Sequence, residues 1–127
     1  MDLGISEKKA IVCASSRGLG KACAESLAKE GTEIIINGVN EENLKNTEAE
    51  FKSKGYKVTS VLGAMEDKAT RKALLEACPE PDILINNSGG PPPGNFFEWS
   101  EEDFLSAIKS NLSLIHISEP TRLRRIS

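Results

Sequence analysis

The sequence contains few of the residues that build disulfide frameworks, metal centres and histidine-dependent catalytic triads. Its three cysteines are odd in number and show no CxxC or zinc-type spacing, and its only histidine is His116. This pattern favours neither a disulfide framework nor a metal site. We therefore predict that Cys13, Cys23 and Cys78 are small core residues.

Long apolar runs and an excess of positive charge are also missing. No segment is apolar enough over its length to cross a bilayer, and the formal net charge is −3. The start of the chain lacks the basic region and apolar stretch that direct export. We therefore expect a cytoplasmic protein with neither a nucleic-acid nor a membrane partner. Its 127 residues are enough for one core but short for a complete doubly wound enzyme.

Apolar, β-branched segments alternate with helix patterns along the chain. The predicted strands cover residues 9–13, 33–37, 57–62 and 82–86, and the predicted helices cover residues 18–30, 40–54, 68–78 and a segment that opens at the capping box of residues 100–103. This alternation indicates βαβ units with right-handed crossovers. The predicted fold class is α/β, a Rossmann-type doubly wound parallel sheet that is incomplete and comprises the first four βα units.

Small and apolar residues recur on one side of the first predicted helix. They are Leu19, Ala22, Cys23, Ser26 and Leu27, at i, i+3, i+4, i+7 and i+8. This spacing predicts that the stripe they form faces the sheet.

A glycine turn joins the first predicted strand to the first helix. Gly18 allows the backbone to approach a pyrophosphate, Gly20 allows the helix to pack close to the strand, and the first helical N–H groups face the anion. Tight βα turns also use glycine, so this turn alone leaves nucleotide binding and a plain turn open. A P-loop is excluded, because it requires glycine at Ser15 and a hydroxyl residue at Ala22.

Ligands of parallel sheets bind at the carboxyl ends of the strands. The glycine turn, the segment after Asn37, the pair Gly63-Ala64 and residues 86–90 all follow predicted strands. We therefore predict that these segments line one crevice.

The glycine turn is the first of three motifs whose order resembles a known family. Asn86-Asn87-Ser88-Gly89 follows the fourth strand, and Asn111 falls on the apolar side of the last helix with Phe104 and Ile108. Singly, these motifs are also typical of a plain turn and a helix end. In this order, the chain resembles the N-terminal half of a short-chain dehydrogenase/reductase, closest to the 3-oxoacyl-[acyl-carrier-protein] reductase-like members.

The resemblance implies a nicotinamide cofactor and its contacts. The family's motif Thr-Gly-x-x-x-Gly-x-Gly begins here with Cys13-Ala14, which adds a methyl group near the pyrophosphate. The asparagine of the catalytic tetrad corresponds to Asn111. The implied cofactor-binding residues are Ala14, Ser15, Ser16, Arg17, Gly18, Leu19, Gly20, Gly38, Val39, Gly63, Ala64, Asn87, Ser88 and Gly89.

The choice of cofactor follows from the residues after the second strand. NAD-preferring members carry an acid there, whereas residues 37–40 contain none, and Arg17 corresponds to a basic residue that contacts a 2′-phosphate. NADP(H) is therefore the preferred cofactor and NAD(H) the alternative. Gly63 replaces the aspartate that holds the adenine amino group, so the resemblance implies weaker adenine binding.

The catalytic serine, tyrosine and lysine of the family have no counterpart in this sequence. Its only tyrosine, Tyr56, does not begin a Tyr-x-x-x-Lys motif. The resemblance implies a parent oxidoreductase that acts on a small-molecule carbonyl or alcohol and forms a homotetramer or dimer. The chain itself is expected to be inert in hydride transfer, and the alternative is a non-catalytic NADP-binding sensor or scaffold.

Residues 112–127 differ in character from the preceding chain. Their sequence, LSLIHISEPTRLRRIS, resembles the translation of a transposase-type sequencing adapter, index and primer. The alternative is a natural basic tail. We expect residues 1–111 to be the dinucleotide-binding half of the family fold and residues 112–127 to be a read-through artefact.

Overall fold

The computed structural model describes residues 2–88, 100–106 and 108. The chain divides into two compact units, Met1–Asn87 and Ser88–Ser127.

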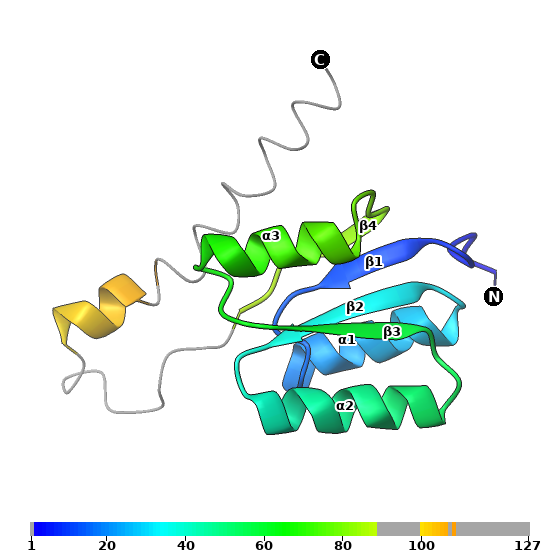
Figure 1. Cartoon of the computed structure of the whole chain (residues 1–127), viewed down its shortest axis with the longest axis horizontal. Helices are drawn as coiled ribbons and strands as arrows, with labels where there is room; N and C mark the ends of the chain where they lie inside the picture. Colours follow the sequence, from blue (N-terminus) through cyan, green and yellow to red (C-terminus); the bar gives the residue numbers. More distant parts are fainter. Residues whose placement is uncertain (1, 89–99, 107, 109–127) are drawn as a thin grey trace, which may run out of the picture. The chain divides into compact units, whose positions relative to one another are not determined.

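The first unit is built on a four-stranded parallel sheet (Figure 1). The strands are β1 (Lys9–Val12), β2 (Glu33–Gly38), β3 (Val58–Leu62) and β4 (Ile83–Ile85), in the spatial order β3-β2-β1-β4. Three helices connect them: α1 (Gly18–Lys29), α2 (Glu41–Ser53) and α3 (Lys68–Ala77). The register places Ile11 of β1 between Ile35 of β2 and Leu84 of β4. The predicted parallel α/β sheet is confirmed.

Helices cover both faces of this sheet. Figure 1 shows α1 and α2 together on one face and α3 on the other. The central strand β2 is therefore shielded on both sides, and Ile34, Ile35 and Ile36 are at most 2% exposed. Phe51 of α2 is fully buried and meets the Tyr56 ring edge-on, with 5.9 Å between the ring centroids. Burial of these large side chains supplies the main stabilisation of the unit.

Helix α1 packs only in part through the side that was predicted. Its buried residues are Gly20, Ala24 and Ala28, spaced four residues apart. Leu19, which the prediction placed against the sheet, is 75% exposed, and Ala22 and Ser26 are exposed as well. Cys23 and Leu27, the other two residues of the predicted stripe, are partly buried against the core. The smallest side chains therefore face the strands, because they allow the helix axis to approach the sheet closely.

Asn40 and Gly31 are typical residues for the helix ends where they lie. Asn40 caps α2, since its Oδ1 accepts a hydrogen bond of 2.9 Å from the Asn43 backbone N–H. Gly31, just after α1, has φ +88°, the left-handed conformation expected there.

The cysteines are free thiols that contribute to packing. Cys13 and Cys78 are buried, and Cys23 is partly buried against the core, which confirms the prediction for the two buried ones and in part for Cys23. Burial raises the pKa of the Cys13 thiol to about 11, although a hydrogen bond from the Asn87 backbone lowers it. The thiol therefore stays protonated at neutral pH and is a poor nucleophile.

In the second unit, residues 101–106 are helical and begin at the predicted capping box. Asp103 Oδ2 accepts a hydrogen bond of 2.8 Å from the Ser100 backbone N–H, and Ser100 Oγ accepts one of 3.2 Å from the Asp103 backbone N–H. Phe104 and Ile108 are 40% and 49% exposed, and the other two residues of the predicted apolar side, Ala107 and Asn111, lie outside the described residues. Within the described residues, none of the helices has the length and apolar character that a membrane span requires.

Candidate functional site

The carboxyl ends of β1, β2 and β3 are joined by backbone hydrogen bonds. The Ser15 N–H donates to the Asn37 carbonyl over 2.7 Å, and the Gly63 N–H donates to the Gly38 carbonyl over 2.9 Å. The glycine turn and the segments after β2 and β3 therefore meet at one edge of the sheet, as the topology predicts. Their role toward a cofactor stays a prediction.

The glycine turn begins with an alanine in an unusual conformation. Ala14 has φ +47°, in the left-handed region that glycine adopts freely and alanine adopts at a cost of about 1–2 kcal/mol. Its carbonyl accepts a hydrogen bond of 3.3 Å from Asn87 Nδ2, which ties the turn to the end of β4. The alanine at this position therefore places strain in the turn as well as a methyl group.

We predict that Ala14→Gly stabilises the chain by about 0.5–1 kcal/mol. Glycine relieves the left-handed strain but loses more conformational entropy on folding, so the net gain is smaller than the strain itself. Urea unfolding followed by circular dichroism measures the effect. As a control, Ala22→Gly at an exposed position inside α1 is expected to destabilise by about 1 kcal/mol. A loss of stability in Ala14→Gly as large as that in Ala22→Gly would contradict the prediction.

Gly20 is required by a close approach. A Cβ atom at this position would overlap the Ala14 carbonyl oxygen and would lie 2.9 Å from Asn87 Nδ2. The glycine thus allows α1 to start directly against the turn and the end of β4. This is the helix–strand approach that the sequence predicted for Gly20.

The start of α1 is suited to an anion. The first N–H groups of a helix have no partner within it, and the first turn of α1 contains no acidic residue. Arg17 is the N-cap residue, and its side chain makes no capping hydrogen bond. Arg17, Gly18 and Leu19 are all exposed. The turn therefore combines available N–H donors with a guanidinium group, as a phosphate ligand requires.

The end of β2 and the two residues after it contain no acid. Gly38 is buried, and a Cβ atom there would lie 2.9 Å from Ser16 Oγ. Val39 is 73% exposed, whereas Gly63 and Ala64, after β3, are half-buried. A side chain at position 38 would therefore require the Ser16 side chain to move.

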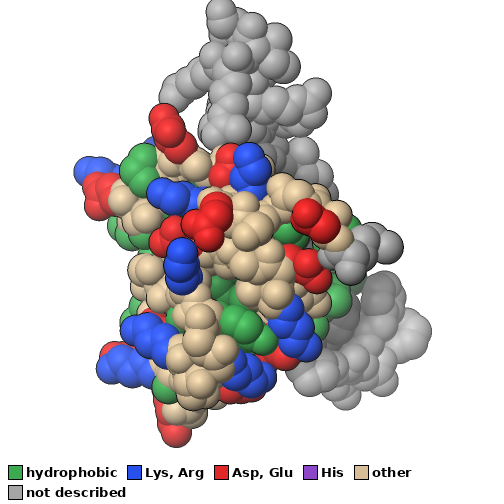
Figure 2. Space-filling view, turned by 90° about the vertical axis from the view of Figure 1, so that its right-hand side faces the viewer, with side chains coloured by type: hydrophobic (Ala, Val, Ile, Leu, Met, Phe, Trp, Pro, Cys, Tyr) green, Lys and Arg blue, Asp and Glu red, His purple; other side chains and the backbone are tan. Residues whose placement is uncertain are grey.

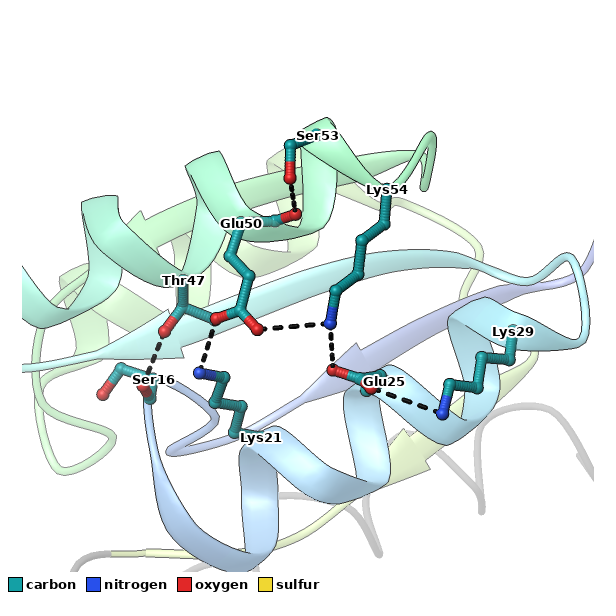
Figure 3. Close-up of polar contacts among 8 residues, drawn as sticks. All are labelled: Ser16, Lys21, Glu25, Lys29, Thr47, Glu50, Ser53 and Lys54. Carbon is teal, nitrogen blue, oxygen red and sulfur yellow. Dashed lines mark hydrogen bonds and ion pairs between the residues drawn. The ribbon is translucent and has the colours of Figure 1, made fainter.

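Helix α2 holds the glycine turn and α1 in place (Figure 3). Thr47 Oγ1 donates a hydrogen bond of 2.7 Å to the Ser16 carbonyl, and the Lys21 Nζ atom lies 2.7 Å from Glu50 Oε2. Lys54 Nζ lies 3.2 Å from both Glu50 and Glu25. Hydrogen bonds from Lys21 and Lys54 lower the pKa of Glu50. The folded state therefore favours the ionised Glu50 carboxylate. The stability that these ion pairs contribute is lost as the pH falls through the Glu50 pKa.

Charge elsewhere on the described surface is mixed. Figure 2 shows Lys and Arg side chains interspersed with Asp and Glu side chains on one face of the molecule. Within the described ranges, no three His, Cys, Asp or Glu residues lie close enough together to hold a metal ion.

One residue of this edge, Asn37, is not among the predicted site residues. Asn37, at the end of β2, is 2% exposed, and its side chain bonds to backbone groups after β1 and in and after β3. The available signal was a carboxamide that directly follows three isoleucines in a buried strand. Ser88 is half-buried in the second unit, and the predictions for Gly89 and Asn111 fall outside the described residues.

Comparison with known proteins identifies the same family that the order of the motifs resembles. A family model described as short chain dehydrogenase matches residues 8–119. The chain is 36% identical over 115 residues to an uncharacterized oxidoreductase, YvaG, of Bacillus subtilis strain 168. That match covers 88% of the chain and 43% of the relative.

Solved structures with the same fold contain either form of the cofactor. A short chain dehydrogenase from Burkholderia cenocepacia in complex with NADP aligns with a TM-score of 0.80 and 25% identity, over 94% of this chain and 51% of that one. A short chain dehydrogenase/reductase from Burkholderia phymatum in complex with NAD aligns with a TM-score of 0.73 and 26% identity, over 84% of this chain and 39% of that one. The chain therefore spans about half the length, or less, of the proteins it matches.

Proposed function

Because the chain belongs to the short-chain dehydrogenase family, we propose that it is the cofactor-binding half of an NADP(H)-dependent oxidoreductase that interconverts a small-molecule carbonyl and an alcohol. The observation that carries this proposal is the edge where the glycine turn and the start of α1 meet the ends of β2 and β3. In the parent protein we propose a 3-oxoacyl-reductase-like activity, a cytoplasmic location and a homotetrameric or dimeric assembly.

Each segment of the edge has a proposed task. The N–H groups at the start of α1 would hold the pyrophosphate, close to the backbone of Gly18. The backbone of Gly63 and Ala64 would contact the adenine, since neither offers a polar side chain. By resemblance to the family, Asn87, Ser88 and Gly89 are proposed as further cofactor-binding residues and Asn111 as the catalytic asparagine. The bound nicotinamide would supply the hydride chemistry.

The preference for NADP(H) depends on two features of the described chain. Arg17 is exposed beside the turn and is available to form charge-assisted hydrogen bonds to a 2′-phosphate. Residues 37–40 contain no carboxylate that would repel this phosphate. Both features favour the phosphorylated cofactor over NAD(H).

We predict that Arg17→Gln weakens NADPH binding about tenfold and leaves NADH binding within about twofold, because a hydrogen bond to a charged group contributes ~1.5–3 kcal/mol. Fluorescence titration with each dinucleotide measures this difference. Lys29→Gln is the matched control: it removes one positive charge from the other end of α1, where the side chain is 61% exposed. An equal loss of affinity for NADPH and NADH in Arg17→Gln would contradict the assigned contact.

The genomic sequence beyond the codon for Asn111 decides between the reductase and the sensor or scaffold. A downstream serine and a Tyr-x-x-x-Lys motif would support the reductase, whereas a natural stop codon would support the sensor. The same sequence tests our proposal that residues 112–127 are translated adapter. The family match continues to residue 119 and therefore extends into this segment. A genomic sequence that encodes residues 112–127 would overturn the proposal that they are translated adapter.

A further inference from the structure

Asn37 uses all of its hydrogen-bonding groups at the edge described above. Its Oδ1 accepts from the Ala14 N–H over 3.1 Å, and its Nδ2 donates to the carbonyls of Val61 and Gly63 over 3.1 and 3.0 Å. Its backbone N–H donates to Ser15 Oγ over 3.0 Å. One buried carboxamide thus connects the glycine turn with the end of β3.

These hydrogen bonds connect the two segments that are proposed to contact the pyrophosphate and the adenine of the cofactor. Ala14 begins the turn beside the pyrophosphate site and is held at φ +47°, a conformation that its own preferences disfavour. Gly63 belongs to the segment proposed to contact the adenine. Because both hydrogen-bond directions come from one planar amide, the distance between these segments depends on Asn37.

An apolar residue would not replace this side chain. The Ala14 N–H and the Val61 and Gly63 carbonyls would each lose a part-buried hydrogen bond, which is costly unless the backbone moves. A shift of either segment would change the spacing that a dinucleotide must fit. Loss of the Asn37 hydrogen bonds is therefore expected to weaken dinucleotide binding even where the packing of β2 is retained.

We infer that Asn37 is a positioning residue for the dinucleotide, which sets the spacing between the glycine turn and the segment after β3. The inference rests on the proposed cofactor-binding function. Asn37 acts through the backbone of its partners rather than through contact with the cofactor.

Two substitutions test this role in the 127-residue chain. Asn37→Ala removes the amide and leaves a cavity, whereas Asn37→Leu removes the hydrogen bonds and retains most of the volume. We expect NADP⁺ affinity to fall about tenfold or more in both variants, as is typical when the support of a binding group is removed. Calorimetric titration gives the affinity, and urea unfolding gives the stability of the same samples.

Thr32→Val is the matched control. Thr32 is also 2% exposed and precedes the same strand, but at its opposite end, where its hydroxyl donates to the Ile5 carbonyl over 2.9 Å. This variant is expected to lose stability and to keep its NADP⁺ affinity within about twofold. Unchanged affinity in Asn37→Leu would overturn the inference, whereas a wild-type chain that binds neither dinucleotide would overturn the proposed function itself.

Hydrogen exchange of the Ala14 amide tests the positioning role of Asn37 in the wild-type chain if both Asn37 variants fail to fold. In the wild-type chain, we expect this amide to exchange as slowly as those of β1, and more slowly still on saturation with NADP⁺. Fast exchange, or exchange that NADP⁺ leaves unchanged, would overturn the inference.

Discussion

Gly20→Ala is expected to abolish dinucleotide binding and to destabilise the fold by about 3 kcal/mol, the upper part of the range for overpacked sites. The added methyl group would overlap the Ala14 carbonyl and press on the Asn87 amide, so α1 would have to move away from the turn. The atoms of Ala14 that it would meet belong to the backbone and cannot move aside as the end of a side chain could. Urea unfolding and NADPH titration measure the two losses.

Gly18→Ala is the matched control for this effect. Gly18 lies two residues earlier and has φ +62°, but a Cβ atom there would meet nothing within 4 Å. Its replacement by alanine should therefore cost only the conformational term, about 1–2 kcal/mol. Equal losses of stability in the two variants would show that the close contact between Gly20 and the Ala14 carbonyl adds no cost of its own.

The second large effect is an absence of turnover. We expect the 127-residue chain to bind NADPH without oxidising it in the presence of any ketone. A positioned general acid alone contributes about 10²–10⁴-fold to proton transfer, and the only tyrosine, Tyr56, lies in the short segment between α2 and β3. It packs against the hydrophobic core, away from the carboxyl ends of the strands.

The loss of NADPH absorbance, compared with a cofactor-only blank, measures this prediction. The Arg17→Gln variant is a useful companion, because it should change binding while turnover stays at the level of the blank. Oxidation of NADPH above the blank by the purified wild-type chain would show that the chain carries a proton donor other than the family's tyrosine.

The strands and helices could be predicted because their signals are local. The β-branched run of β2, the Asn40 cap and the left-handed Gly31 all depend on residues a few positions apart. The packed side of α1 could not be predicted in the same way. The i, i+3, i+4 spacing of apolar residues predicted that Leu19 faces the sheet. The buried residues are instead Gly20, Ala24 and Ala28, because small side chains allow the helix to pack close to the strands.

The candidate site shows the same division. Its segments were found from motif spacing and from the rule that parallel strands end at one edge. The strain at Ala14 and the role of Asn37 were not found, because both depend on contacts between residues distant in the chain: Asn37 is 23 positions from Ala14, and Asn87 is 73. Spacing along a sequence does not reveal which backbone groups a buried amide will meet.

The parallel α/β architecture, the family and the place of the glycine turn follow from the amino-acid sequence alone, because periodicity, capping and motif order are properties of neighbouring residues. The three-dimensional packing was needed to show which residues of α1 are fully buried, why Gly20 admits no side chain and which amide connects the turn with the end of β3. These features arise where segments far apart in the chain meet, and their distances are set by the packing of the whole unit.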